Sequence, residues 1–151
     1  MQFQQIDRSD SEKVYVAIYN VSGGTLSAGA AAFYNAVTND GLAVSAGTVI
    51  NKYLFAGIVK DAISDSAYGR AQVYGNCSAY VGIGSSSVSA AAGTQLDSVT
   101  SATYLSTYAP IAGSSATIAN PWNFVTLMAG FDSAAAMSNT PQLKSVFVRA
   151  L

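Results

Sequence analysis

The sequence of 151 residues contains no histidine and a single cysteine, Cys77. Histidine is the commonest general base and metal ligand, so Ser-His-Asp and Cys-His arrangements are excluded. A single cysteine provides neither an intrachain disulfide nor a cysteine-based metal cage, and we expect it as a small buried hydrophobe. We therefore expect no enzyme activity: no catalytic residue, no cofactor and no metal site.

Charge is also scarce. Charged residues make up 10% of the chain, with a formal net charge of −1, against a usual share of about 25%. Binding to DNA, RNA or an anionic membrane needs clustered Lys and Arg, so neither nucleic acid nor membrane is an expected partner. A surface with so little charge favours contact between copies, and we expect a homo-oligomer or a lattice component.

Long hydrophobic runs are missing too. No basic segment followed by an apolar stretch begins the sequence, and the apolar runs are far shorter than the roughly 20 residues of a membrane helix. The polar start, residues 1–12, is expected to be an exposed arm or a frayed terminus, followed by one β-rich domain over residues 13–151. Residues 82–107, rich in Ser, Ala, Gly and Thr, are expected to form a loop-rich excursion of that domain.

The acidic residues invite a catalytic interpretation that their positions do not favour. Asp61 and Asp65 are four residues apart, as paired carboxylates of a glycosidase could be. They fall at a strand end and a turn, however, where Asp hydrogen-bonds its own backbone. The same reasoning covers Asp40 and Asp97, so we expect turn chemistry at all four.

The dominant hydrophobic period is two, which is typical of strands. "VYVAIY" (residues 14–19), "AAAFYNAV" (residues 30–37) and "LKSVFVRAL" (residues 143–151) read as strands, and we favour a strand within "NPWNFVTLMAGF" (residues 120–131). Gly57 lies within a strand-favouring run and predicts a bulge or a close backbone approach. Turn signals at "NDG" (residues 39–41) and at Gly75-Asn76 predict a hairpin and a three-strand meander.

This pattern predicts an all-β fold: a compact antiparallel sandwich or barrel with Gly-rich turns and little helix. Nine tyrosines are the remaining oddity, several of them in or beside predicted strands. Their presence is explained by sheet propensity and cross-strand packing, or by a subunit interface formed by Tyr15, Tyr19 and Tyr74. The sequence leaves both explanations open.

Several segments resemble small tailed-bacteriophage capsid decoration (cement) proteins. They are "KVYVAIYNVSGGTLSAG" (residues 13–29), the turn at Asp40-Gly41, "LFAGIVKDAISDSAYGRAQVYG" (residues 54–75) and "KSVFVRAL" (residues 144–151). The third segment is the most specific, because an acid-rich turn is followed by Tyr-Gly-x-x-Gln-Val-x-Gly. Together they cover about half of the chain, and residues 82–120 are unmatched.

The resemblance implies a virion structural protein, assembled in the bacterial cytoplasm and located on the outer capsid surface. Its partners would be the major capsid protein and itself, as a homotrimer. If the N-terminal arm docks on the capsid, Phe3 and Ile6 are its expected apolar anchors. Two alternatives remain: another β-rich virion component of the minor head or tail, and a carbohydrate-binding, adhesin-like β-sandwich in which tyrosines and Trp122 stack on sugars.

Overall fold

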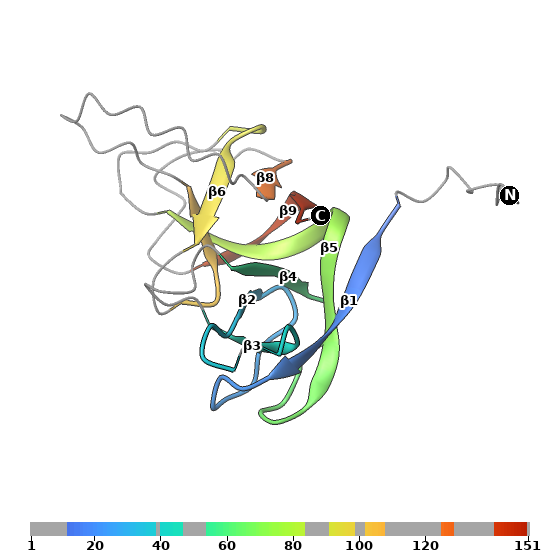
Figure 1. The fold of residues 1–151 in the computed structure, drawn as a ribbon. Coiled ribbons are helices and arrows are strands. Elements are labelled where there is room, and N and C mark those ends of the chain that lie inside the picture. Colours follow the sequence, from blue (N-terminus) through green and yellow to red (C-terminus); the bar gives the residue numbers. More distant parts are fainter. Residues whose placement is uncertain are drawn as a thin grey trace, which may run out of the picture.

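The computed structural model describes residues 12–38, 40–46, 54–83, 91–98, 102–107, 125–128 and 141–150. Within them the chain forms strands and no helix, which confirms the predicted all-β class (Figure 1). The strands are β1 (Val14–Asn20), β2 (Ala31–Tyr34), β3 (Ala43–Ser45), β4 (Phe55–Val59), β5 (Tyr68–Ile83), β6 (Gln95–Ser98), β7 (Leu105–Thr107), β8 (Val125–Leu127) and β9 (Gln142–Arg149). Their sheet is mixed rather than antiparallel, because β1 and β3, and also β5 and β7, run parallel.

The strand pairings close into two circuits that share β5. The first runs β1-β3-β2-β4-β5 and returns to β1; the second runs β5-β7-β6-β8-β9 and returns to β5. We call these the lower ring and the upper ring, as they lie in Figure 1. The first half of β5 belongs to the lower ring and its second half to the upper ring.

β5 changes its orientation at the point where the rings meet. Its register with β1 shifts between Val14 and Tyr15, so that Val14 pairs with Tyr74 whereas Tyr15 pairs with Gln72. Gly75 follows with a φ of +96°, a conformation that residues with a Cβ rarely adopt. The sequence predicted a turn between two strands here, and this prediction is wrong: the chain bends and continues as one strand of 16 residues.

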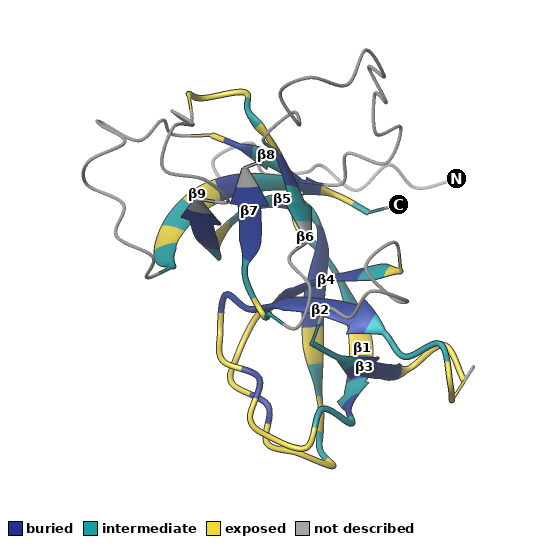
Figure 2. Cartoon of the chain, turned by 90° about the vertical axis from the view of Figure 1, so that its left-hand side faces the viewer, coloured by how far each residue is buried: buried dark blue, intermediate teal, exposed yellow. Residues whose placement is uncertain are grey.

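Each ring has its own cluster of buried side chains. The lower cluster includes Ile18, Val44 and Ala71, whereas the upper includes Val81, Leu127, Val146 and Val148. Neighbouring residues on β2 and β4 divide between the clusters: Ala32 and Val59 belong to the lower one, Ala31, Phe33 and Ile58 to the upper one. The outer face of β2 and β4 therefore packs against the upper ring, and both strands are almost wholly buried (Figure 2).

Local predictions from alternation and turn chemistry are confirmed where the structure describes the chain. In β1, Ile18 is buried while Ala17 is exposed, and in β9 Val146 and Val148 are buried while Arg149 is exposed. β2 and β3 form the predicted hairpin, whose turn is closed by the Asp40 carboxylate accepting from the N–H groups of Leu42 and Ala43.

Gly57 sits at the predicted close approach. It has a φ of +140°, and a Cβ there would lie 2.6 Å from the carbonyl oxygen of Gln72. The register between β2 and β4 shifts beside it, between Ala32 and Phe33. The predicted bulge and the tight backbone contact both occur.

Some predictions fall partly or wholly outside the described residues. Residues 1–11 of the predicted arm, with Phe3 and Ile6, lie outside, as does Trp122. Within the predicted excursion 82–107, the described parts form β6 and β7, which pair with each other. The described part of the chain includes no helix long and apolar enough to cross a membrane.

Candidate interaction surfaces

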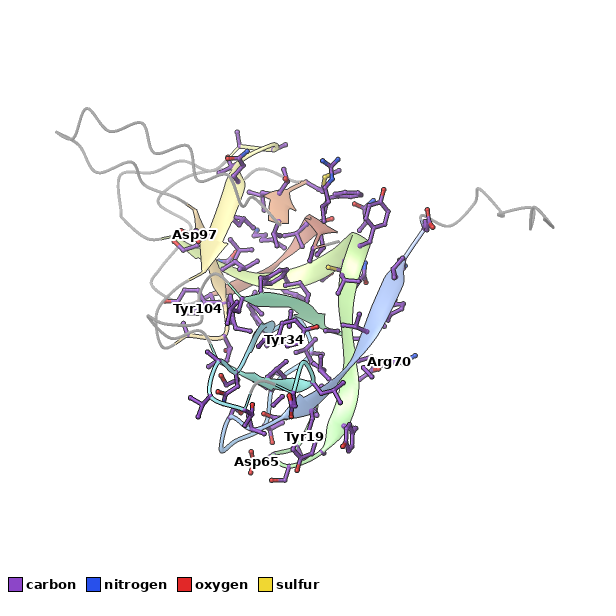
Figure 3. The ribbon with its side chains drawn as sticks, in the orientation of Figure 1. Tyr19, Tyr34, Asp65, Arg70, Asp97 and Tyr104 are labelled. Carbon is purple, nitrogen blue, oxygen red and sulfur yellow. The ribbon has the colours of Figure 1, made fainter. Side chains whose placement is uncertain are left out.

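The outer face of the β1–β5 pair carries a row of aromatic and charged side chains, which we call the tyrosine face: Tyr15, Ala17, Tyr19, Tyr68 and Arg70. Tyr19 pairs in register with Tyr68, and their ring centroids are 4.8 Å apart. The Arg70 guanidinium lies 5.7 Å from the centre of the Tyr15 ring, an arrangement in which a cation is attracted to the aromatic face. Figure 3 shows Arg70 pointing away from the ribbon. Tyr68 is 73% exposed, so this face offers aromatic surface to a partner.

Tyr74 belongs to a different surface. The register shift places it opposite Val14, whose neighbours at two-residue spacing, Val16 and Ile18, point away from the tyrosine face. The Tyr74 ring instead contacts Phe147 of β9 edge-on, with centroids 5.4 Å apart. The structure thus brings two predicted interface residues, Tyr15 and Tyr19, onto one face and sets Tyr74 apart from them.

Asp40, Asp61 and Asp65 lie in turns or at a strand end, as predicted, whereas Asp97 lies within β6 and pairs with Ser106 of β7, so the turn prediction is wrong for Asp97. Asp61 pairs with Arg70 at 3.1 Å, with both side chains largely exposed. Asp65 accepts from the N–H of Gly23 at 2.8 Å and from the Ser66 hydroxyl at 3.2 Å, which holds two loops of the lower ring together. Asp40 closes its turn, and the two backbone hydrogen bonds from Ala43 and Leu42 lower its pKa. Among the described residues, no three of Asp, Glu, Cys and His gather as a metal-ligand group.

A cleft of about 430 Å³ lies where the two rings meet. Its polar lining includes Lys13, Tyr15, Lys60, Gln72, Asn76 and Ser78. The apolar part of the wall includes Ile58, Val59 and Leu143, of which Leu143 is 53% exposed. Sequence reasoning missed this cleft because its lining comes from both ends of the chain and from the middle of β5.

The middle of β5 exposes one backbone edge to this cleft. β9 pairs with β5 from Tyr74 to Val81. Tyr74 also pairs with β1, and Val81 also pairs with β7. Because a strand has two edges, β1 and β7 both lie on the edge of β5 opposite β9. Between them, no described strand pairs with that edge. The Gln72 side chain partly replaces a strand by donating to the carbonyl oxygens of Tyr74 at 3.0 Å and Asn76 at 3.1 Å.

The only cysteine lies in the same region. Burial raises the pKa of the Cys77 thiol to about 11, while the positive charges of Lys13 and Lys60 act in the opposite direction. Both ammonium groups are therefore close enough to Cys77 to affect its titration. Cys77 was expected to be buried; the structure shows it partly buried, packed at the margin of the upper cluster.

No protein-family model matches the chain, and no curated protein matches it. Among solved structures, the chain is similar to the crystal structure of the N base of the head fiber gp8.5 of bacteriophage phi29. The sequence identity is 9% and the TM-score is 0.49, over 92% of this chain and 96% of that chain. A similarity of this size assigns neither a family nor a function.

Proposed function

We propose that the protein is a structural component of a tailed-bacteriophage head, a decoration protein that binds the outer surface of the expanded capsid. In this role it contacts neighbouring major capsid subunits and stabilises them against the pressure of the packaged DNA. It has no catalytic task. It acts as a homo-oligomer, for which a trimer is the expected state.

One observation carries this proposal: the segments that resemble decoration proteins are neighbours in the fold. Residues 13–29 contain β1, residues 54–75 contain β4 and the first half of β5, and residues 144–151 contain most of β9. These strands all pair with β5. The resemblance therefore falls on one connected set of paired strands that spans both rings, as expected if it reflects a shared structural core.

The surface is also suited to binding by contact rather than by charge attraction. The tyrosine face combines apolar rings with hydroxyl and guanidinium groups, a composition that is enriched at protein interfaces. A protein that binds the expanded shell and not the unexpanded one stabilises the expanded state by its binding free energy. Many copies on a symmetric shell multiply a modest contribution per site.

Co-sedimentation with shells of the parent virus that lack this protein tests the proposal. We expect saturable binding to expanded shells, with a fixed number of copies per capsid subunit, and little binding to unexpanded shells. A protein with residues 1–12 deleted tests the docking arm, and we expect it to keep its oligomeric state and lose shell binding. Absence of binding to both kinds of shell would contradict decoration and favour a tail or minor head component.

The Tyr19–Tyr68 pair, of which Tyr68 is exposed, favours a second candidate, a carbohydrate-binding module. Exposed aromatic rings can stack on the apolar face of a sugar, and the Asp65 carboxylate lies at the same end of the lower ring as Tyr19 (Figure 3). A glycan array separates this function from decoration. Reproducible binding that is lost in Tyr68→Ala would favour the sugar, and a blank array would exclude it for the glycans displayed.

A further inference from the structure

We propose that the cleft between the two rings is a peptide-binding site, which takes an extended acidic segment of a partner protein as an added strand on β5. The inference rests on the cleft itself and does not depend on the decoration function. Three independent features carry it: the charge of the lining, the unpaired backbone edge and an unsatisfied buried amide.

The lining has one sign of charge. Lys13 and Lys60 both contribute to it, and no acidic residue is among its described lining residues. Neither lysine has an ion-pair partner in the part of the chain that the structure describes. Lys13 directly precedes β1 and Lys60 directly follows β4, so the fold brings together two cations that are far apart in the sequence. Their combined field favours an anionic occupant.

The backbone edge favours a peptide over other anions. Alternate residues of a strand direct their N–H and C=O groups to the same edge. Along β5 the edge opposite β9 receives the carbonyl groups of Tyr74 and Asn76 and the N–H of Tyr80, which donates to the Gly29 carbonyl oxygen at 2.9 Å. By this alternation the N–H and C=O of Ser78 face the same edge, and they have no partner among the described residues. An extended peptide that adds to such an edge satisfies these groups.

Asn76 supplies the third feature. Its Oδ1 atom is buried and accepts no hydrogen bond from the described residues. A buried acceptor left unsatisfied costs about 1–3 kcal/mol. Asn76 also lines the cleft, so a peptide N–H or hydroxyl group that reaches this oxygen would satisfy it and remove a defect of the free protein.

The remaining lining fits the side chains of a short peptide. The volume of about 430 Å³ is within the range of pockets that hold small ligands, roughly 300–1,000 Å³. Leu143, which is 53% exposed, offers apolar surface to the methylene groups of Glu, while the lysines receive the carboxylates. A nucleic-acid backbone would need more than two cations for stable binding at physiological salt.

The test uses two blocked hexapeptides, Glu-Thr-Glu-Thr-Glu-Thr and its neutral counterpart Gln-Thr-Gln-Thr-Gln-Thr, titrated into the ¹⁵N-labelled protein. We expect saturable amide shifts at Asn76, Cys77 and Ser78 with the acidic peptide, and at least tenfold weaker binding of the neutral one. The double variant Lys13→Gln/Lys60→Gln should weaken binding of the acidic peptide at least tenfold. The charge-matched control Lys144→Gln/Arg149→Gln, at two cations of β9 that do not line the cleft, should bind like the unchanged protein.

A second measurement tests strand addition separately from charge. Two versions of the acidic peptide are compared, one with N-methyl groups on its odd-numbered residues and one with N-methyl groups on its even-numbered residues. One set should abolish binding, because its N–H groups face β5, and the other should be tolerated. The proposal is overturned if both double variants lose binding equally, if both N-methylated peptides bind normally, or if a six-nucleotide single-stranded DNA occupies the cleft and the peptide does not. Shell co-sedimentation is unaffected by these outcomes, so failure of the cleft and failure of the decoration function are distinguishable.

Discussion

Tyr19 and Tyr68 face each other across the β1–β5 pair, with ring centroids 4.8 Å apart and ring planes at 45°. The pair lies on the outside of the lower ring, and Tyr68 is exposed over 73% of its surface. The lower ring of strands therefore folds without burying the Tyr68 side chain. The side chain is therefore available to a second molecule at little cost to stability.

We predict that Tyr68→Ala separates association from stability. Loss of one exposed cross-strand partner should lower the free energy of unfolding by less than about 1 kcal/mol. If the tyrosine face is the subunit interface, the variant should show a smaller sedimentation-velocity mass than the unchanged protein at the same concentration. Val37→Ala, which removes another exposed apolar side chain elsewhere on the lower ring, is the control. An unchanged mass in Tyr68→Ala would remove this face from the interface.

Asn20 gives a prediction about stability. Its buried side chain donates to the carbonyl oxygens of Gly24 at 2.7 Å and Ile63 at 2.9 Å, and accepts from the N–H of Ser22 at 2.9 Å. These bonds tie the loop after β1 to the loop before β5. Asn20→Ala removes three hydrogen bonds of a fully buried side chain, although the carbonyl oxygen of Ile63 still accepts from the N–H of Leu26. The loss should lower the free energy of unfolding by about 2–3 kcal/mol in urea denaturation.

Asn35→Ala is the matched control for this experiment. Among the described residues, the Asn35 side chain accepts one hydrogen bond, from the N–H of Val37 two residues on, at 2.8 Å in an exposed turn. We expect a loss below about 1 kcal/mol there. Equal losses in the two variants would mean that the Asn20 bonds do not join the loops in the way described.

Local sequence patterns were sufficient for β1 and β9, because alternation reports the more buried face of each strand directly. β2 was predicted as well, although both of its faces are buried. The turn at Asp40 was predictable for the same kind of reason, since the carboxylate bonds its own backbone two and three residues on. The bulge at Gly57 followed from a glycine within a strand-favouring run. Each of these features is decided within a few residues.

The closure of the two rings was not predictable in this way. The parallel pairs β1–β3 and β5–β7 join segments far apart in the chain, and no local signal specifies a partner strand. Gly75-Asn76 looked like a turn because glycine permits positive φ in turns and in bends alike. The strand is seen to continue only because the residues before Gly75 pair with β1 and the residues after it pair with β9. The cleft depends on this bend and was missed with it.

Gly75 therefore provides a test of the bend. A Cβ there would overlap the carbonyl oxygen of Glu12, and the residue has a φ of +96°. Backbone strain of about 1–2 kcal/mol adds to overpacking of about 1–3 kcal/mol, so Gly75→Ala should lower the free energy of unfolding by about 2–5 kcal/mol. Gly41→Ala is the control, because Gly41 has a φ of +69° with open space around it. It should show the strain alone, about 1–2 kcal/mol, and the same loss in both variants would contradict the overlap.

Cys77 gives a prediction about pH. Burial raises its pKa from 9.0 to about 11, so at pH 8 the folded protein holds about a hundredfold less thiolate than the unfolded chain. Iodoacetamide should accordingly modify the folded protein about a hundredfold more slowly than the urea-unfolded protein. Comparable rates in the two states would show that the thiol is exposed or unperturbed.

The same shift makes stability depend on pH in a defined direction. Between pH 9 and 11 the unfolded chain has released the Cys77 proton and the folded protein has kept it, so the unfolded state binds fewer protons. Stability then falls as pH rises, by up to about 1.4 kcal/mol per pH unit from this group. Cys77→Ala lacks this contribution, and its free energy of unfolding should fall less steeply over the same interval.

Because Lys13 and Lys60 hold the pKa of Cys77 below the value that burial alone would give, Lys13→Gln/Lys60→Gln should slow alkylation further. Faster alkylation in that variant would mean that the two lysines protect the thiol by covering it rather than by their charge.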